Sequence, residues 1–259
     1  MTYQQFVGDP AFRRHYWARN HVGWRHMRGM RPNAGHHALA ELEGRGLLSG
    51  VITQNVDLLH TRAGSAAVID LHGTYAEVRC LRCGDLTSRA ELDARLSALN
   101  PGFTERMREV GDVELAPDAD AVISTTAAFR VADCLLCGGL LKPHIVYFGE
   151  NVPKDRVARS YAMVDAAQAL LVAGSSLTVL SGLRFVRHAA KSGIPVVIVN
   201  RGRTRGDELA TVKLDSGCSE ALVGLAAALP AMSGADDRLE PSVGFEPTTT
   251  ALQERCSTS

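Results

Sequence analysis

Residues 170–200 read LLVAGSSLTVLSGLRFVRHAAKSGIPVVIVN, and this stretch predicts the fold class of the chain. Two short apolar runs, Leu170–Ala173 and Val196–Val199, flank a segment at residues 180–192 that has the length and composition of a helix. Continuous apolar strands alternating with helices are typical of parallel sheets that are covered on both faces. We therefore predict an α/β fold with a Rossmann-like parallel sheet.

The same alternation extends on both sides of this unit. Further strands are predicted at residues 47–53, 68–71, 145–148 and 211–214. Further helices are predicted at residues 34–43, 56–63, 154–167 and 219–229, and residues 3–31 are expected to be helical with breaks at Gly8–Pro10 and Arg31–Pro32. Glycine, proline and the capping residue Asn33 set these boundaries.

Two Cys-x-x-Cys pairs interrupt the pattern, with CLRCG at residues 80–84 and CLLCG at residues 134–138. Four thiolates in two tight turns can hold a tetrahedral Zn²⁺ ion, and a glycine after each pair suits the left-handed turn. A site with four cysteines has no open position for water or substrate, so the metal is expected to be structural. Disulfides or unrelated thiols are the alternatives. The predicted zinc ligands are Cys80, Cys83, Cys134 and Cys137.

The thiol pairs also suggest how the chain is divided. We predict a small zinc-binding domain at residues 79–138, with a helix near residues 89–99 and an irregular acidic segment near 112–120. It is inserted into a discontinuous Rossmann-like domain at residues 1–78 and 139–230. Residues 231–259 are rich in Ser, Thr, Pro and Asp without periodicity, which predicts a disordered tail.

Composition argues against several classes of partner. The 28 Lys and Arg residues balance 28 Asp and Glu residues, so charge gives no reason to expect a nucleic acid or an anionic membrane as partner. No apolar run reaches the roughly 18 residues of a membrane span, and the first residues lack the apolar core of a signal peptide. Cysteines in metal spacing favour a reducing compartment, so a cytoplasmic location is predicted.

Polar clusters follow three of the predicted strands, where open parallel sheets bind ligands. In the first cluster, amides and a carboxylate can hydrogen-bond to a ribose or a carboxamide. In the second, a glycine and hydroxyl groups before a helix favour a phosphate. The third, a polar turn, suits an adenosine ribose. Each cluster alone is also compatible with ordinary helix capping. The residues are Gln54, Asn55 and Asp57, then Gly174, Ser175 and Ser176, then Asn200, Arg201 and Gly202.

A single histidine stands at the end of another predicted strand. His72 lies in the sequence Leu71-His72-Gly73, where a neutral imidazole could serve as a general base near pH 7. A lone histidine is more often structural, but the neighbouring polar clusters favour the catalytic interpretation.

These segments together resemble a known family. The stretches ITQNVDLLH, IDLHGT, the two Cys-x-x-Cys pairs, GGLLKPHIVYFGENVP and LLVAGSSL look like those of the sirtuins, the NAD-dependent protein-lysine deacylases, over residues 3–229. The stretches FVGDPAFRRHYWARNHVGW and ALNPGF, with the Asn-Arg-Gly cluster, are similar to the class II branch, which includes mitochondrial sirtuin four and many bacterial proteins.

The resemblance implies roles for individual residues. His72 matches the catalytic base that deprotonates a ribose hydroxyl of NAD⁺, and the three strand-end clusters match the NAD⁺ contacts, with Cys218 near the adenine. The strip that lines the acyl-lysine channel matches Val146, Phe148, Gly149 and Glu150. The implied reaction transfers the acyl group from a lysine of a protein substrate to ADP-ribose and releases nicotinamide, while one structural zinc ion holds the small domain.

The resemblance also raises an expectation about the N-terminus. Sirtuins open with a strand, a GAGxS turn and a PDFR-like segment, and the sequence from Met1 onward contains none of these. We therefore expect either a start that lies further upstream or a short form with impaired activity. Two rival functions stay open: protein mono-ADP-ribosyl transfer from the same pocket, and a non-catalytic interaction module stabilised by zinc.

Overall fold

The computed structural model describes residues 1–109, 114–115, 121–122 and 126–230. The helices are α1 (Tyr3–Gly8), α2 (Pro10–Gly29), α3 (Ala34–Gly44), α4 (Leu59–Ala63), α5 (Arg89–Leu99), α6 (Phe103–Glu109), α7 (Lys154–Asp165), α8 (Leu180–Lys191) and α9 (Cys218–Ala228). The strands are β1 (Val51–Thr53), β2 (Val68–Asp70), β3 (Gly73–Cys80), β4 (Leu86–Ser88), β5 (Glu114–Leu115), β6 (Ala121–Val122), β7 (Leu141–Ile145), β8 (Leu170–Ala173), β9 (Val196–Val199) and β10 (Val212–Leu214).

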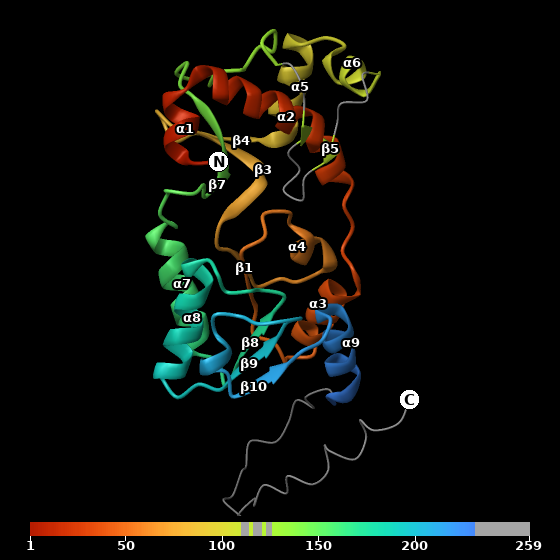
Figure 1. Cartoon of the computed structure of the whole chain (residues 1–259), viewed down its shortest axis with the longest axis vertical. Helices are drawn as coiled ribbons and strands as arrows, with labels where there is room; N and C mark the ends of the chain where they lie inside the picture. Colours follow the sequence, from red (N-terminus) through yellow and green to blue (C-terminus); the bar gives the residue numbers. More distant parts are fainter. Residues whose placement is uncertain (110–113, 116–120, 123–125, 231–259) are drawn as a thin grey trace, which may run out of the picture.

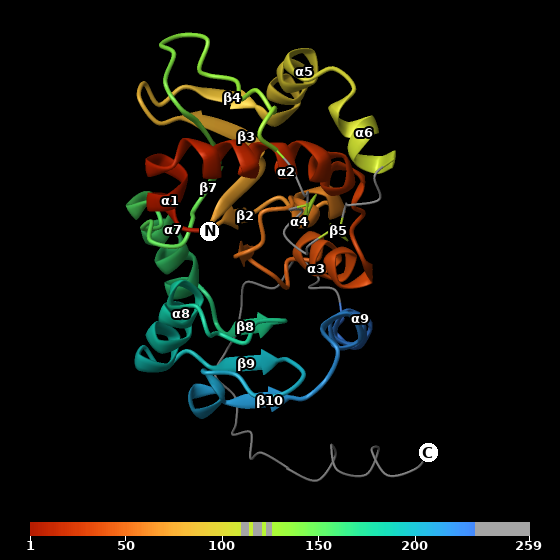
Figure 2. The same ribbon diagram turned by 45° about the horizontal axis from the view of Figure 1, so that its top comes forward.

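Parallel strands form the lower part of the molecule in Figure 1. The order β10–β9–β8 is parallel throughout, and β1 pairs with β2 in parallel as a separate two-stranded sheet. Helices α7 and α8 lie on one side of β8–β10, and α3 and α9 lie on the other (Figures 1 and 2). The predicted Rossmann-like α/β fold is confirmed, and its apolar core includes Leu183, Val186 and Ile198.

An antiparallel sheet, in the order β4–β3–β7, carries the first thiol pair and packs at the other end of the molecule. The sequence did not predict β3, and the strand predicted at residues 145–148 is wrong in position and in its expected parallel pairing. The strand is β7, which ends at Ile145 and pairs antiparallel with β3. Lys142 and Pro143 lie within β7, and such residues rarely occupy a strand interior, which explains the displaced prediction.

Two other boundaries differ from the sequence prediction. The strand predicted at residues 47–53 begins only at Val51, because the backbone N–H groups of Leu47 and Leu48 donate to the Leu42 carbonyl and complete the end of α3. The helix predicted at residues 56–63 begins only at Leu59. Leu58 before it has a left-handed backbone with φ of 62°, and the Asp57 side chain accepts a hydrogen bond from the Leu59 N–H at 2.9 Å.

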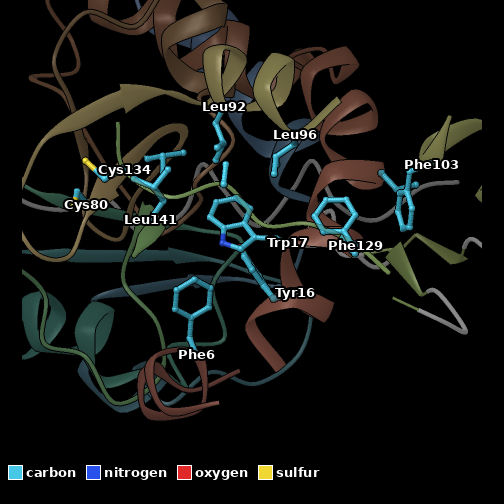
Figure 3. Close-up of a cluster of buried hydrophobic side chains, with 14 of the residues drawn as sticks. Phe6, Tyr16, Trp17, Cys80, Leu92, Leu96, Phe103, Phe129, Cys134 and Leu141 are labelled. Carbon is cyan, nitrogen blue, oxygen red and sulfur yellow. The ribbon is translucent and has the colours of Figure 1, made fainter. Parts of the chain in front are cut away.

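The two N-terminal helices pack against the module that carries the thiol pairs. Thr2 caps α1 and Asp9 caps α2, where Pro10 fits the first helical position. Phe6, Tyr16 and Trp17 then join a buried cluster with Cys80, Cys134, Leu92, Leu96, Phe103, Phe129 and Leu141 (Figure 3). These three aromatic residues therefore share a core with residues of the predicted zinc domain.

Some expectations fall on parts of the chain that lie outside the described residues. The predicted tail at residues 231–259 is one of these, and most of the acidic segment at residues 112–120 is another. Among the helices that are described, none combines the length and the apolar character needed to cross a membrane.

Candidate functional site

The three polar clusters and His72 lie at matching ends of the parallel strands. Ala173 of β8 and Leu214 of β10 both pair with Val199 of β9, so the turns that follow begin at one edge. The Gly174 N–H donates to the Val199 carbonyl at 3.0 Å, which fixes the start of the Gly-Ser-Ser turn beside Asn200. In the sheet formed by β1 and β2, Thr53 is opposite Asp70, so Gln54 and His72 also follow their strands at the same end.

Side-chain hydrogen bonds connect the two parallel sheets, β8–β10 and β1–β2, at this edge. Gln54 Nε2 donates to Ser181 Oγ at 3.2 Å, and Ser175 Oγ donates to Gln54 Oε1 at 3.4 Å. His72 Nε2 lies 2.8 Å from Ser181 Oγ. One chain of hydrogen bonds thus connects the residues that follow β1, β2 and β8 with Ser181 in the first turn of α8. It links the candidate base to the candidate phosphate turn.

His72 is also tied to the predicted substrate strip. The Val146 N–H donates to the His72 carbonyl at 2.8 Å, so the backbone of this strip begins directly beside the base. This approach depends on Gly73, which follows the histidine with φ of 83°. A Cβ atom at this position would lie 2.0 Å from the His144 carbonyl oxygen, so no other residue would let β3 and β7 meet here.

Burial sets the charge state of the candidate base. Desolvation lowers the pKa of His72 below its ordinary value of 6.5, and the Arg184 charge lowers it further. A hydrogen bond with the Gln54 backbone acts in the opposite direction and raises this pKa. The imidazole is therefore neutral near pH 7, as a general base must be.

The predicted substrate strip is exposed at its centre and anchored at its end. Phe148 is 69% exposed, and its carbonyl accepts a hydrogen bond from the Tyr3 N–H at 3.0 Å. Glu150 turns inward, where its Oε2 atom accepts from the Tyr147 N–H at 2.7 Å and pairs with Lys142 Nζ at 2.9 Å. Glu150 thus shapes the loop that presents Val146, Phe148 and Gly149.

The predicted adenosine end surrounds a cavity. A space of about 420 Å³ is lined by Asn200, Arg201 and Cys218 together with Ser216, Gly217, Ser219 and Glu220. Asn200 Nδ2 donates to the Arg201 carbonyl at 2.8 Å, and the Gly202 N–H donates to Asp215 Oδ1 at 3.1 Å, so the turn is fixed by its own contacts. Cys218 begins α9, and its thiol points back to the Val199 carbonyl at 3.4 Å. The space is open to solvent, and its lining combines apolar surface with the polar groups of Asn200, Arg201 and Ser219.

Side chains of the first two clusters also bond to the backbone of their own turns. Asp57 Oδ1 accepts from the Leu59 N–H at 2.9 Å, and Ser175 Oγ accepts from the Leu177 N–H at 3.2 Å. Ser176 Oγ lies 2.9 Å from Thr178 Oγ1 on the exposed side of the same turn. Asn55 is exposed, and its N–H donates to Thr53 Oγ1 at 3.1 Å. These contacts are compatible with a ligand role, because they order the turns and leave other polar atoms available.

The four cysteine thiols form a compact group. All four Sγ atoms lie within 4.8 Å of one another, with Cys80 and Cys137 at 3.5 Å and Cys83 and Cys134 at 3.8 Å. Zinc–sulfur bonds of about 2.3 Å place tetrahedral sulfur atoms about 3.8 Å apart, so these residues fit Zn²⁺. Gly84 and Gly138 have φ of 78° and 68°, which confirms the left-handed turns expected after each pair. No disulfide joins the described cysteines.

Two residues of this region were not found from the sequence. Ser181 reads as an ordinary serine in the first turn of a helix, and nothing in the local pattern links it to a histidine more than a hundred residues away. Lys142 reads as a surface lysine, yet its side chain is only 6% exposed and lies 4.2 Å from the centre of the Tyr147 ring. A contact between distant segments creates the environment of Ser181, whereas the folded loop that follows Lys142 brings Tyr147 and Glu150 to it. Neither arrangement is visible in a single-sequence pattern.

Known proteins resemble this chain in sequence and in overall fold. The model of the Sir2 family matches residues 1–181. NAD-dependent protein deacetylase 1 of Mycobacterium avium is 68% identical over 226 residues, which cover 87% of this chain and 80% of that protein. A Streptomyces coelicolor protein of the same name is 52% identical and covers 83% of this chain and 71% of its own length. A solved Sir2 structure in complex with the inhibitor EX-527, 2′-O-acetyl-ADP-ribose and a deacetylated p53 peptide has a TM-score of 0.67 at 30% identity, covering 87% of this chain and 83% of that one.

Proposed function

Because the chain belongs to the Sir2 family, we propose that it is an NAD-dependent protein deacetylase that acts on acetylated lysine side chains of proteins. One observation carries the proposal. The backbone of the candidate base His72 is hydrogen-bonded to Val146 at 2.8 Å, so the base lies between the predicted substrate strip and the polar strand ends. Relatives named as NAD-dependent protein deacetylases support the same activity.

The residues fit the proposed cofactor at separate points. Asn200, Arg201 and Cys218 line a cavity that suits an adenosine, and the Gly174–Ser176 turn lies beside it at the same sheet edge. Gln54 lies between this turn and His72, where its amide suits the nicotinamide end. When bound, NAD⁺ supplies a ribose that carries a good leaving group.

The residues of the chain supply base catalysis and positioning. His72 is neutral at pH 7, and its Nε2 lone pair can accept the proton of a substrate hydroxyl. The strip at Val146–Gly149 would hold the substrate backbone as an added strand. The zinc ion, held by four cysteines with no open position, would stabilise the module and take no part in the reaction.

Class II membership is part of the proposal. It is supported by the stretch ALNPGF, in which Asn100 has a defined structural task. Asn100 Oδ1 accepts from the Arg130 N–H at 2.7 Å, and Asn100 Nδ2 donates to the Arg130 carbonyl at 2.9 Å. This double contact joins the end of α5 to the segment that leads into the second thiol pair. A reducing compartment is also proposed, since the four thiols must stay reduced to bind a metal.

A deacetylation assay tests the proposal. The chain is incubated with an acetyl-lysine peptide and NAD⁺, and both the peptide and released nicotinamide are measured by mass spectrometry. We expect NAD⁺-dependent loss of the acetyl group, a decrease of at least about 100-fold in His72→Ala, and full activity in His26→Ala, whose histidine is exposed on α2. Transfer of labelled ADP-ribose to protein without deacetylation would instead support the mono-ADP-ribosyltransferase alternative.

A further inference from the structure

Ser181 has an unusual position for a serine in the first turn of a helix. Only 8% of it is exposed, and its Oγ atom lies 2.8 Å from His72 Nε2 and 3.2 Å from Gln54 Nε2. Within the described part of the chain, no side chain caps the start of α8: neither Val179, the residue before the helix, nor Ser181 makes a capping hydrogen bond there. Its hydroxyl is directed to the base.

The direction of each hydrogen bond follows from what the groups can do. Gln54 Nε2 can only donate, so Ser181 Oγ accepts from it and keeps its own hydrogen for another partner. That hydrogen can go to His72 Nε2, which accepts it when the ring carries its own hydrogen on Nδ1. Ser175 Oγ donates to Gln54 Oε1 at 3.4 Å and fixes the amide in the orientation that this chain of bonds requires.

The second ring nitrogen of His72 completes the arrangement. A backbone contact that raises the pKa of an imidazole is made by an acceptor, and for His72 this group belongs to Gln54. Since Nε2 faces Ser181, Nδ1 is the ring nitrogen left for this acceptor. Gln54 therefore acts on the histidine through its backbone and, by way of Ser181, through its side chain.

The start of α8 packs closely against the side chain of Gln54. Gly182 follows Ser181, and a Cβ atom there would lie 2.9 Å from Gln54 Oε1 and 3.1 Å from Gln54 Cδ. The Ser-Gly pair at the start of α8 thus provides the hydroxyl at one position and the close approach at the next.

We propose that Ser181 is a positioning residue for His72, which holds the ring in the Nδ1–H tautomer with the Nε2 lone pair directed at the Ser181 hydroxyl. The proposal rests on the proposed function only in its consequence for catalysis. The tautomer itself is a property of the chain without any ligand. In the free protein the Ser181 hydroxyl occupies the lone pair that a substrate hydroxyl meets during the reaction.

The consequence for activity is a loss in turnover rather than in binding. Residues that orient a functional histidine typically contribute about 10- to 100-fold. We expect Ser181→Ala to lower kcat about 10-fold with KM for NAD⁺ and peptide within about twofold. Ser181→Thr, which restores a hydroxyl, should recover most of the activity. Ser192→Ala, at the exposed end of the same helix, serves as the matched control.

The decisive measurement is the tautomer of His72, read by ¹⁵N–¹H NMR on histidine-labelled, ligand-free protein during a pH titration. We expect the Nδ1–H form with one pKa in the wild type, Ser181→Thr and Ser192→Ala, and mixed tautomers with a higher pKa in Ser181→Ala. Arg184 is the charged group that acts on His72 among the described residues, and it is unchanged in all of them. An identical tautomer and pKa in Ser181→Ala would overturn the inference, whether or not the chain deacetylates a peptide.

Discussion

Lys142 Nζ and Glu150 Oε2 form a buried ion pair at 2.9 Å that closes the loop carrying the predicted substrate strip. Lys142 also donates to the Ile145 carbonyl and lies over the Tyr147 ring, so its ammonium group contacts three parts of one short segment. Burial lowers the pKa of Lys142, and the hydrogen bond to Glu150 counteracts this effect. This ion pair therefore stabilises the conformation of the loop that carries the strip.

Removal of the negative partner should destabilise this loop. Glu150→Gln leaves a buried ammonium group without a counter-charge, and we expect the free energy of unfolding to decrease by about 3 kcal/mol. KM for the peptide should rise more than kcat falls. Urea denaturation and steady-state kinetics measure the two effects. Glu77→Gln, the same change at a half-exposed residue paired with His144, is the control and should cost less than about 1 kcal/mol. Equal effects of the two variants would contradict this account.

Loss of one zinc ligand should change both the zinc content and the stability of the protein. Cys80→Ser removes a buried ligand from the four-thiol group, so we expect zinc to fall from one ion per chain to nearly none, measured by plasma mass spectrometry. The unfolding free energy should fall by about 4 kcal/mol or more, because the cluster in Figure 3 includes two of the ligands. Cys218→Ser should keep its zinc. A zinc-free wild type with unchanged stability would refute a structural metal.

Arg89 provides a stability test away from the candidate site. Its side chain has no exposed surface, donates twice to Asn20 Oδ1 and lies 3.5 Å from Asp93, with its guanidinium 4.9 Å from the Trp24 ring. Arg89→Met leaves Asn20 and Asp93 without this partner, and we expect a loss of about 3 to 5 kcal/mol in guanidinium denaturation. Arg25→Ala, at an exposed pair with Glu105, should change stability by less than about 1 kcal/mol.

The pH dependence of activity follows from His72. The base works only when neutral, and its pKa lies below the ordinary value of 6.5, so activity should be lost as pH falls through that lower pKa. The acid limb of the kcat/KM profile is therefore expected below pH 6.5. Arg184→Gln removes a charge that lowers the pKa and should move this limb to higher pH, whereas Arg187→Gln on the same helix should leave it in place. A limb that Arg184→Gln does not move would exclude His72 as the titrating base.

The sequence predicted the Leu170–Val199 unit closely because its strands are continuous apolar runs and its helix is long. Strand β3 was missed, since GTYAEVRC mixes polar and apolar residues and its burial depends on α5 and β7. Lys142 and Pro143 concealed β7, because a charged residue and a proline are uncommon inside strands and the burial of Lys142 depends on the folded loop that brings Glu150 to it.

The sequence predicted individual residues of the candidate site, but not the hydrogen bonds that connect them. Strand-end residues such as Gln54, Ser175 and His72 were identified because parallel sheets bind ligands at that edge. Their connection through Ser181 was not, because helix α8 and strand β2 are far apart in the chain and meet only in the folded protein. The strand-end roles in binding NAD⁺ stay predictions.

Calorimetric titration of the chain with NAD⁺, in a sample shown to be folded and zinc-replete, tests the central claim most directly. The account predicts saturable binding of one NAD⁺ per chain, weakened when the cavity beside Asn200 is filled by Gly217→Leu. No heat of binding, with zinc content and folding intact, would contradict the enzyme and leave a zinc-stabilised interaction module as the better description.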